Sequence, residues 1–361
     1  MSSPWRSSPK MKSLSEVFGT IPVPTGNGFW KNLRAFMGPG FLVAVGYMDP
    51  GNWATDLAGG ASFGYTLLSV ILVSSIFAII LQHLALKLGV ASGRDLAQAC
   101  GDAFSKPVAI FLWFVCEIAI AACDLAEVIG SALALQLLFG IPILAGIVIT
   151  ILDVFLILYF QNKGFKVIES IVLSLLIVIV CCFAYELFIS QPSMSGIMAG
   201  LVPQSSVVMN PSQLYVAIGI LGATVMPHNL YLHSSIVQTR AIKDTDEDKA
   251  KAIKYATWDS TLSLGLAFFI NAGILILAAA AFHGNNLQHV ADIRDAYQLL
   301  DPVLGSKLAS ILFAVALLAS GQNATLTGGR FPRFADYSLA SSPHYSLDRD
   351  YSCLFYHVDL R

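Results

Sequence analysis

Long runs of apolar residues recur along this chain, separated by short polar or charged segments. A membrane-crossing helix needs about 20 predominantly apolar residues, and eight runs reach or approach that length. They predict eight membrane helices, at residues 36–58, 65–86, 107–138, 142–160, 167–189, 214–237, 258–282 and 308–327. The pattern therefore predicts an all-α integral membrane protein.

Composition supports the same class. The 361 residues are 56% hydrophobic and 12% charged, whereas a soluble domain carries about 25% charged residues. The six cysteines show no paired ligand spacing, so we expect neither a disulfide framework nor a structural zinc ion. The lipid bilayer is the expected environment, and we expect no bound cofactor and no nucleic-acid partner.

Basic residues predict the orientation. Of the 21 lysines and arginines, 19 lie in segments that fall on one side of the predicted helices. These segments are residues 1–35, 87–106, 161–166, 239–257 and 328–361. Because cytoplasmic loops carry the excess of positive charge, we expect a cytoplasmic N-terminal segment at 1–35 and a cytoplasmic tail.

Two of the predicted helices contain residues that disrupt a helix. Residues 49–52 read Asp-Pro-Gly-Asn, and residues 226–229 read Met-Pro-His-Asn. A charged side chain at mid-bilayer costs about 2.5–3.5 kcal/mol. Proline and glycine at that depth leave backbone groups without their helical hydrogen-bond partners. This is tolerated only where the backbone is buried in protein or lines a cavity. The alternative interpretation is that both prolines form ordinary kinks.

The two breaks correspond to each other. Aligning their prolines pairs Asp49 with Met226 and Asn52 with Asn229. Five helices precede the second break, so the two halves run in opposite directions. We therefore predict a first five-helix repeat at 36–189 and a partial second repeat, helices six to eight, at 190–328. Discontinuous helices at matching positions of two halves indicate a transporter site.

The residue types at the breaks suggest the ligand. Asp49 supplies an anionic oxygen and Asn52 a neutral one, while Met226 supplies a thioether. Freed carbonyls are expected near Gly46 and Ala223. Oxygen ligands suit calcium and magnesium, and a thioether favours softer transition metals. The combination favours a first-row divalent cation such as manganese or iron, although a methionine in an apolar helix can also simply fill the core.

Other ionisable residues lie at membrane depth. Glu117, Asp124 and Glu127 share one face of the third predicted helix, and His228 and His233 follow the second break. Intramembrane carboxylates and histidines are candidates for a proton relay. They can also be structural hydrogen-bond partners. Glu169, near a helix end, is assigned no role.

Residues 49–52 and 226–228 resemble the defining motifs of the natural resistance-associated macrophage protein (Nramp) family. The segments 38–41 and 320–325 resemble it as well, and the match covers about residues 30–328. The resemblance implies a LeuT-type inverted-repeat fold. It also implies proton-coupled uptake of manganese or ferrous iron across the bacterial plasma membrane, with manganese as the first choice.

The resemblance also implies roles for single residues. The metal ligands would be Asp49, Asn52, the carbonyl of Ala223, and Met226. The proton pathway would comprise the residues Asp49, Glu117, Asp124, Glu127, His228 and His233.

The C-terminal region departs from the family. Nramp proteins have eleven or twelve helices, whereas residues 329–361 form a polar tail that resembles nothing in the family and is expected to be disordered. Without helices nine to eleven, the second repeat is incomplete. The missing helices would supply a polar metal ligand and basic partners for the carboxylates, so impaired transport is expected.

Two functions from other classes compete with metal transport. A cation-coupled amino-acid transporter on the same fold would need a small residue in place of Asp49, so that the substrate carboxylate meets a free helix N-terminus. A membrane enzyme would need a nucleophile–base pair or a closed metal-ligand set such as His-Glu-x-x-His. Because neither pattern occurs, we do not expect an enzyme.

Overall fold

The structure, a computed structural model, describes residues 18–23, 28–161, 165–290, 292–306 and 308–328. The predicted tail at 329–361 and most of the N-terminal segment lie outside the described residues. The division into repeats at 36–189 and 190–328 stays a prediction.

All eight predicted spans are helical, and two of them are interrupted. By length and composition, five described stretches are apolar enough to cross a membrane. The spans are formed by α2 (Pro39–Gly46) with α3 (Pro50–Phe63), α4 (Leu68–Ser92), α6 (Lys106–Phe139), α7 (Ile143–Gln161), α8 (Phe165–Ser190), α11 (Pro211–Thr224) with α12 (Pro227–Ile236), α13 (Asp246–Ala281) and α15 (Ala309–Gly328).

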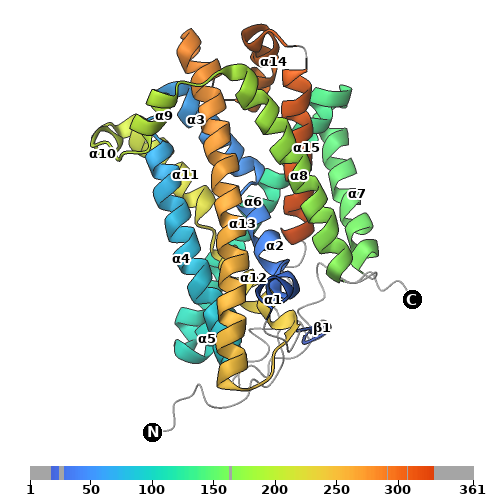
Figure 1. The fold of residues 1–361 in the computed structure, drawn as a ribbon. Coiled ribbons are helices and arrows are strands. Elements are labelled where there is room, and N and C mark those ends of the chain that lie inside the picture. The colour runs from blue at the N-terminus through green and yellow to red at the C-terminus, as the bar shows by residue number, and fades with distance from the viewer. Residues whose placement is uncertain (1–17, 24–27, 162–164, 291, 307, 329–361) are drawn as a thin grey trace.

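Short elements cover the two ends of the bundle (Figure 1). One end, here called the basic end, carries α1 (Phe29–Phe36), α5 (Leu96–Ala103), η2 (Val237–Thr239) and the parallel pair β1 (Ile21–Pro22) and β2 (Arg240–Ala241). The opposite end carries α9 (Met194–Gly200), α10 (Ser206–Met209), η3 (His283–Asn285) and α14 (Ile293–Leu304).

Helix α13 runs through the bundle and packs against α2, α3, α4 and α8, while α15 packs against α6 and α8 (Figure 1). Helix α6 is different. Only 6% of its most apolar 18-residue stretch is buried inside the protein. The corresponding share is 33% to 67% in the other four candidate spans of the described residues. Helix α6 therefore presents most of its apolar surface outward, and its inner face is the part that can contribute to a site.

Both predicted breaks are confirmed. Helix α2 ends at Gly46 and α3 begins at Pro50, and α11 ends at Thr224 before α12 begins at Pro227. Each proline occupies the first turn of a new helix, where its fixed φ is favourable and its missing N–H is not needed. The alternative of ordinary kinks within continuous helices is therefore wrong.

The first break is stabilised by side chains that bind its freed carbonyls. Asn271 of α13 donates to the Tyr47 carbonyl at 2.8 Å, and Trp53 donates to the Met48 carbonyl at 3.2 Å. Ser320 of α15 also donates to the Met48 carbonyl. The Trp53 ring packs between those of Phe183 and Phe313, with centroid distances of 4.9 and 5.3 Å. The unwound turn is thus held by three helices.

A buried ion pair holds the other end of α2. Arg240, 2% exposed, contacts Glu169 at 3.1 Å and donates to the Met37 carbonyl at 2.8 Å. Glu169 lies so close to Gly38, whose φ is 134°, that a β-carbon there would overlap its carboxylate. Asp259 of α13 accepts from the Gly40 amide at 2.7 Å. A glutamate near a helix end is usually exposed to solvent. Glu169 instead pairs with Arg240, a partner that the sequence alone does not indicate.

We expect Arg240→Met to lower the free energy of unfolding by about 3–5 kcal/mol, because it leaves the buried Glu169 without its cation. The measurement is unfolding of the detergent-purified chain. Lys249→Met is the matched control, since it removes a surface ion pair with Asp244 (2.5 Å) and should have no measurable effect. Equal losses in both variants would contradict the structural role of Arg240.

Candidate functional site

The two breaks place Asp49 and Met226 at equivalent positions. Each is the N-cap residue of the second half-helix, Asp49 for α3 and Met226 for α12. They are 4% and 3% exposed, respectively, and Asn52 is 1% exposed. The predicted donors thus lie at the ends of half-helices, enclosed within the protein.

The side chain of Asn52 connects the two breaks. Its amide nitrogen Nδ2 donates to Asp49 Oδ1 at 2.7 Å and to the Ala223 carbonyl at 3.0 Å. The Asn52 backbone N–H also donates to Asp49 Oδ1, at 2.8 Å, and so caps α3. Both partners of Nδ2 are hydrogen-bond acceptors. The NH₂ group of Asn52 therefore lies between two oxygens, and each of these oxygens could instead coordinate a cation.

The thioether of Met226 has two neighbours that carry hydrogen. Cys123 Sγ of α6 lies 3.9 Å from Met226 Sδ, and Asn229 Nδ2 lies 4.0 Å from it. Asn229 in turn packs against Gly46, where a β-carbon would overlap its amide. The amide three residues after each N-cap therefore contacts that N-cap side chain in both breaks. This matches the alignment of Asp49 with Met226 and of Asn52 with Asn229.

This donor set suits a divalent metal ion. It combines a carboxylate, a side-chain amide, a backbone carbonyl and a thioether, which together offer hard and soft ligands. Within the described residues, no group of three or more His, Cys, Asp or Glu side chains could hold a metal. Any metal bound here would depend on the amide, the carbonyl and the thioether as well as on Asp49.

One of the predicted proton-pathway residues on α6, Glu127, lies near Asp49. Glu127 is buried, and both Asp124 and Asp49 lie within electrostatic range of it. Glu117 lies seven residues before Asp124, which is about 10 Å along a helix. The structure thus places Glu127 within electrostatic range of Asp49 and of Asp124, while Glu117 lies farther along α6.

The two histidines of α12 are both buried. His228 directly follows Pro227, and His233 lies one and a half turns later. His233 Nδ1 is 2.9 Å from Gln82 Oε1, and Gln82 Nε2 donates to the Tyr47 hydroxyl at 2.8 Å. This series of polar contacts links α12 through α4 to the first break. Gln82 was not predicted, although a glutamine in the middle of an apolar span is a signal for a buried polar contact.

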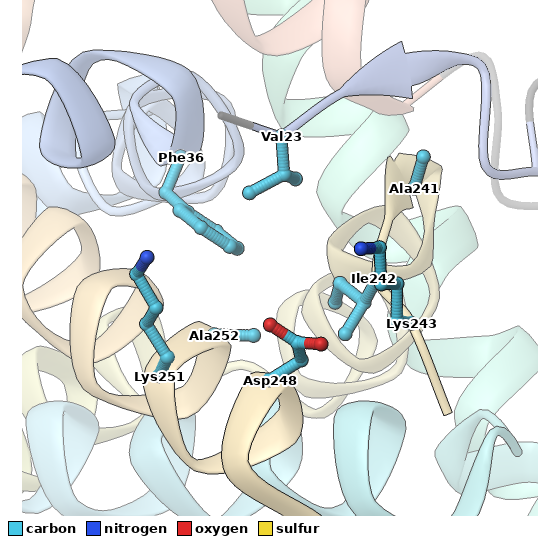
Figure 2. Close-up of a pocket in the computed structure, with 8 residues that line it drawn as sticks. All are labelled: Val23, Phe36, Ala241, Ile242, Lys243, Asp248, Lys251 and Ala252. Carbon is cyan, nitrogen blue, oxygen red and sulfur yellow. The ribbon is translucent and has the colours of Figure 1, made fainter. Parts of the chain in front are cut away.

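A hollow at the basic end is a poor candidate for the same chemistry (Figure 2). Figure 2 shows Phe36, Val23 and Ile242 facing it beside the charged side chains of Lys243, Asp248 and Lys251. Two ammonium groups beside a single carboxylate would repel a divalent cation. The breaks remain the better candidate site.

Sequence comparisons identify relatives over most of the chain. A profile described as natural resistance-associated macrophage protein-like matches residues 40–333. The divalent metal cation transporter MntH of Listeria welshimeri is 60% identical over 324 residues, which is 90% of this chain and 72% of the relative. The divalent metal cation transporter MntH of a Nostoc species is 59% identical over 315 residues, which is 87% of this chain and 71% of the relative.

Structural comparisons agree. A crystal structure of a mutant of the Eremococcus coleocola manganese transporter matches with a TM-score of 0.83 and 42% identity, covering 94% of this chain and 71% of that chain. MHP1, a nucleobase-cation-symport-1 family transporter, matches with a TM-score of 0.58 at 18% identity and shares the fold alone. The fold is thus the LeuT type with two broken helices, and the chain belongs to the natural resistance-associated macrophage protein (Nramp) family.

Proposed function

We propose that this chain transports divalent transition-metal ions, with manganese preferred and ferrous iron second, into the cell together with protons. The membrane would be the plasma membrane, with the basic end in the cytoplasm, and no cofactor would be needed. The observation that supports this most directly is the contact of Asp49, Asn52 and the Ala223 carbonyl across two breaks. The activities named for the Listeria and Eremococcus relatives support the same substrate class.

Metal binding would rearrange the amide of Asn52. In the described structure its NH₂ group joins the Asp49 carboxylate to the Ala223 carbonyl. A cation placed between these two oxygens would displace the NH₂ group, and rotation of the amide would present its oxygen instead. Met226 would then supply the thioether, which calcium, a hard ion with a preference for oxygen, does not favour.

Proton movement would use the carboxylates of α6. Glu127 lies within electrostatic range of both Asp49 and Asp124, so a negative charge on Glu127 is repelled by each of them. Like charges at short distance disfavour full ionisation of a group, so one of them would hold a proton. Binding of a divalent cation at Asp49 would change which of these carboxylates holds the proton. Metal binding and proton movement would thereby be coupled.

The amino-acid transporter is the less favoured alternative. In such a protein a free helix N-terminus would receive the substrate carboxylate. Here the first turn of α3 is already capped by Asp49. A substrate carboxylate would meet an anion at this position.

We expect Asp49→Asn to abolish measurable manganese binding, because it removes the only anionic donor among the four proposed ligands while keeping the side-chain shape. Isothermal titration of the detergent-purified chain with Mn²⁺ measures this. Gel filtration of each variant checks that it is folded. Unchanged affinity in a monodisperse variant would contradict the proposed site.

We expect Met226→Leu to reduce discrimination against calcium, with manganese binding weakened about tenfold and calcium binding newly detectable, because a soft donor is lost. Met48→Leu is the matched control, since Met48 is also buried at a break and leucine conserves the volume of methionine. If both variants exclude calcium as the unmodified chain does, the thioether does not select the metal.

We expect Glu127→Gln to reduce proton flux relative to manganese uptake, because it removes a protonatable group beside Asp49. Uptake into proteoliposomes is followed with radioactive manganese and an internal pH dye. The assay is run on this chain and on a version extended with the remaining length of the Listeria relative. Glu186→Gln, which alters a buried carboxylate of α8, is the control. An unchanged ratio of protons to metal in Glu127→Gln would contradict the relay.

A further inference from the structure

A thiol lies beside the thioether of the proposed site. Cys123 Sγ is 3.9 Å from Met226 Sδ, although the two residues belong to different helices and are 103 positions apart. From its sequence context Cys123 is one of several cysteines in apolar runs, where the side chain behaves as a small hydrophobe. The contact between its sulfur and that of Met226 distinguishes it from the other cysteines that the structure describes.

The separation of the sulfurs fits a shared ion. Zinc binds thiolate sulfur at about 2.3 Å, and two such ligands in a tetrahedral arrangement lie roughly 3.8 Å apart. The observed 3.9 Å between Cys123 Sγ and Met226 Sδ differs little from this value. One ion could therefore contact both sulfurs without a shift of α6 relative to α12.

The thiol also lies within electrostatic range of the carboxylate of the site. Among the carboxylates that act electrostatically on Cys123, Asp49 acts most strongly, ahead of Glu127 and Asp124 on the same helix. Helix α6 is fixed against the first break as well, because Gly130 packs so closely on Pro50 that a β-carbon would overlap the proline ring. Cys123 thus lies between the two breaks, near the anionic donor of one and the soft donor of the other.

We propose that Cys123 is an additional ligand at this site for soft, thiophilic divalent cations such as Cd²⁺. This inference rests on the proposed function and extends it to the choice among metals. The thiol loses its proton to water as its sulfur forms a bond to the cation, so one proton is released for each ion bound. A harder ion such as Mn²⁺ is held by the oxygen donors and Met226, and leaves the thiol protonated.

Affinity measurements with two metals test the role of Cys123. The full chain is purified in detergent and titrated with Cd²⁺ or Mn²⁺, with exposed Cys181 changed to serine in every variant. Loss of one protein–metal contact should weaken binding at least about tenfold. Cys123→Ser should therefore weaken Cd²⁺ binding by that factor and leave Mn²⁺ binding unchanged. Cys116→Ser, two turns earlier on α6, should change neither.

Two results would overturn the proposal. One is equal Cd²⁺ affinity in Cys123→Ser and the parent chain, and the other is a parallel loss of affinity for both metals, as expected if the thiol only packs against Met226.

A spectroscopic measurement can be made on the chain with Cys123 in place, so its result does not depend on whether the Cys123→Ser variant folds. X-ray absorption of the chain with less than one equivalent of Cd²⁺ should show two sulfur ligands, and a single sulfur would contradict the role of Cys123. Absence of Mn²⁺ binding in the parent chain would contradict the proposed function instead, because the cadmium spectrum reports on Cys123 separately.

Discussion

The structure depends on one constraint: a backbone interrupted inside an apolar bundle must find partners for the groups that the interruption frees. At the first break, Asn271 binds the Tyr47 carbonyl, while Trp53 and Ser320 bind that of Met48. These donors come from α13, α3 and α15. The packing of three helices is therefore set by two carbonyls that a continuous helix would have satisfied internally.

The same constraint produces the site. A break creates a new helix N-terminus, and an N-terminus needs a capping side chain. Asp49 caps α3, and its counterpart Met226 occupies the same position in α12 without a capping hydrogen bond. The first of these positions therefore has a capping role, and the second does not. The pair consequently brings a hard and a soft donor to the meeting point of two helix ends.

The spans, both breaks and the equivalence of Asp49 with Met226 could be predicted from the sequence. Proline, glycine and a carboxylate in an apolar run are strong local signals. The contacts between distant residues could not be predicted, because nothing local connects Arg240 to Glu169, 71 positions apart, or Gln82 to His233, 151 positions apart. Cys123 was equally hidden, since an apolar run gives a thiol no distinguishing neighbour. The short helices between the spans were not predicted, because none of them contains a long apolar run; they are α1, α5, α9, α10 and α14.

The bridge formed by Asn52 has a consequence for a carrier that must also change shape while it holds no cargo. A bare carboxylate in such surroundings would resist that step unless an ion accompanied it. Here the amide hydrogens of Asn52 bind Asp49 Oδ1 and the Ala223 carbonyl, so the carboxylate has a hydrogen-bond donor that belongs to the protein itself. The ends of α3 and α11 are thus joined at the centre of the bundle by a side chain of the protein.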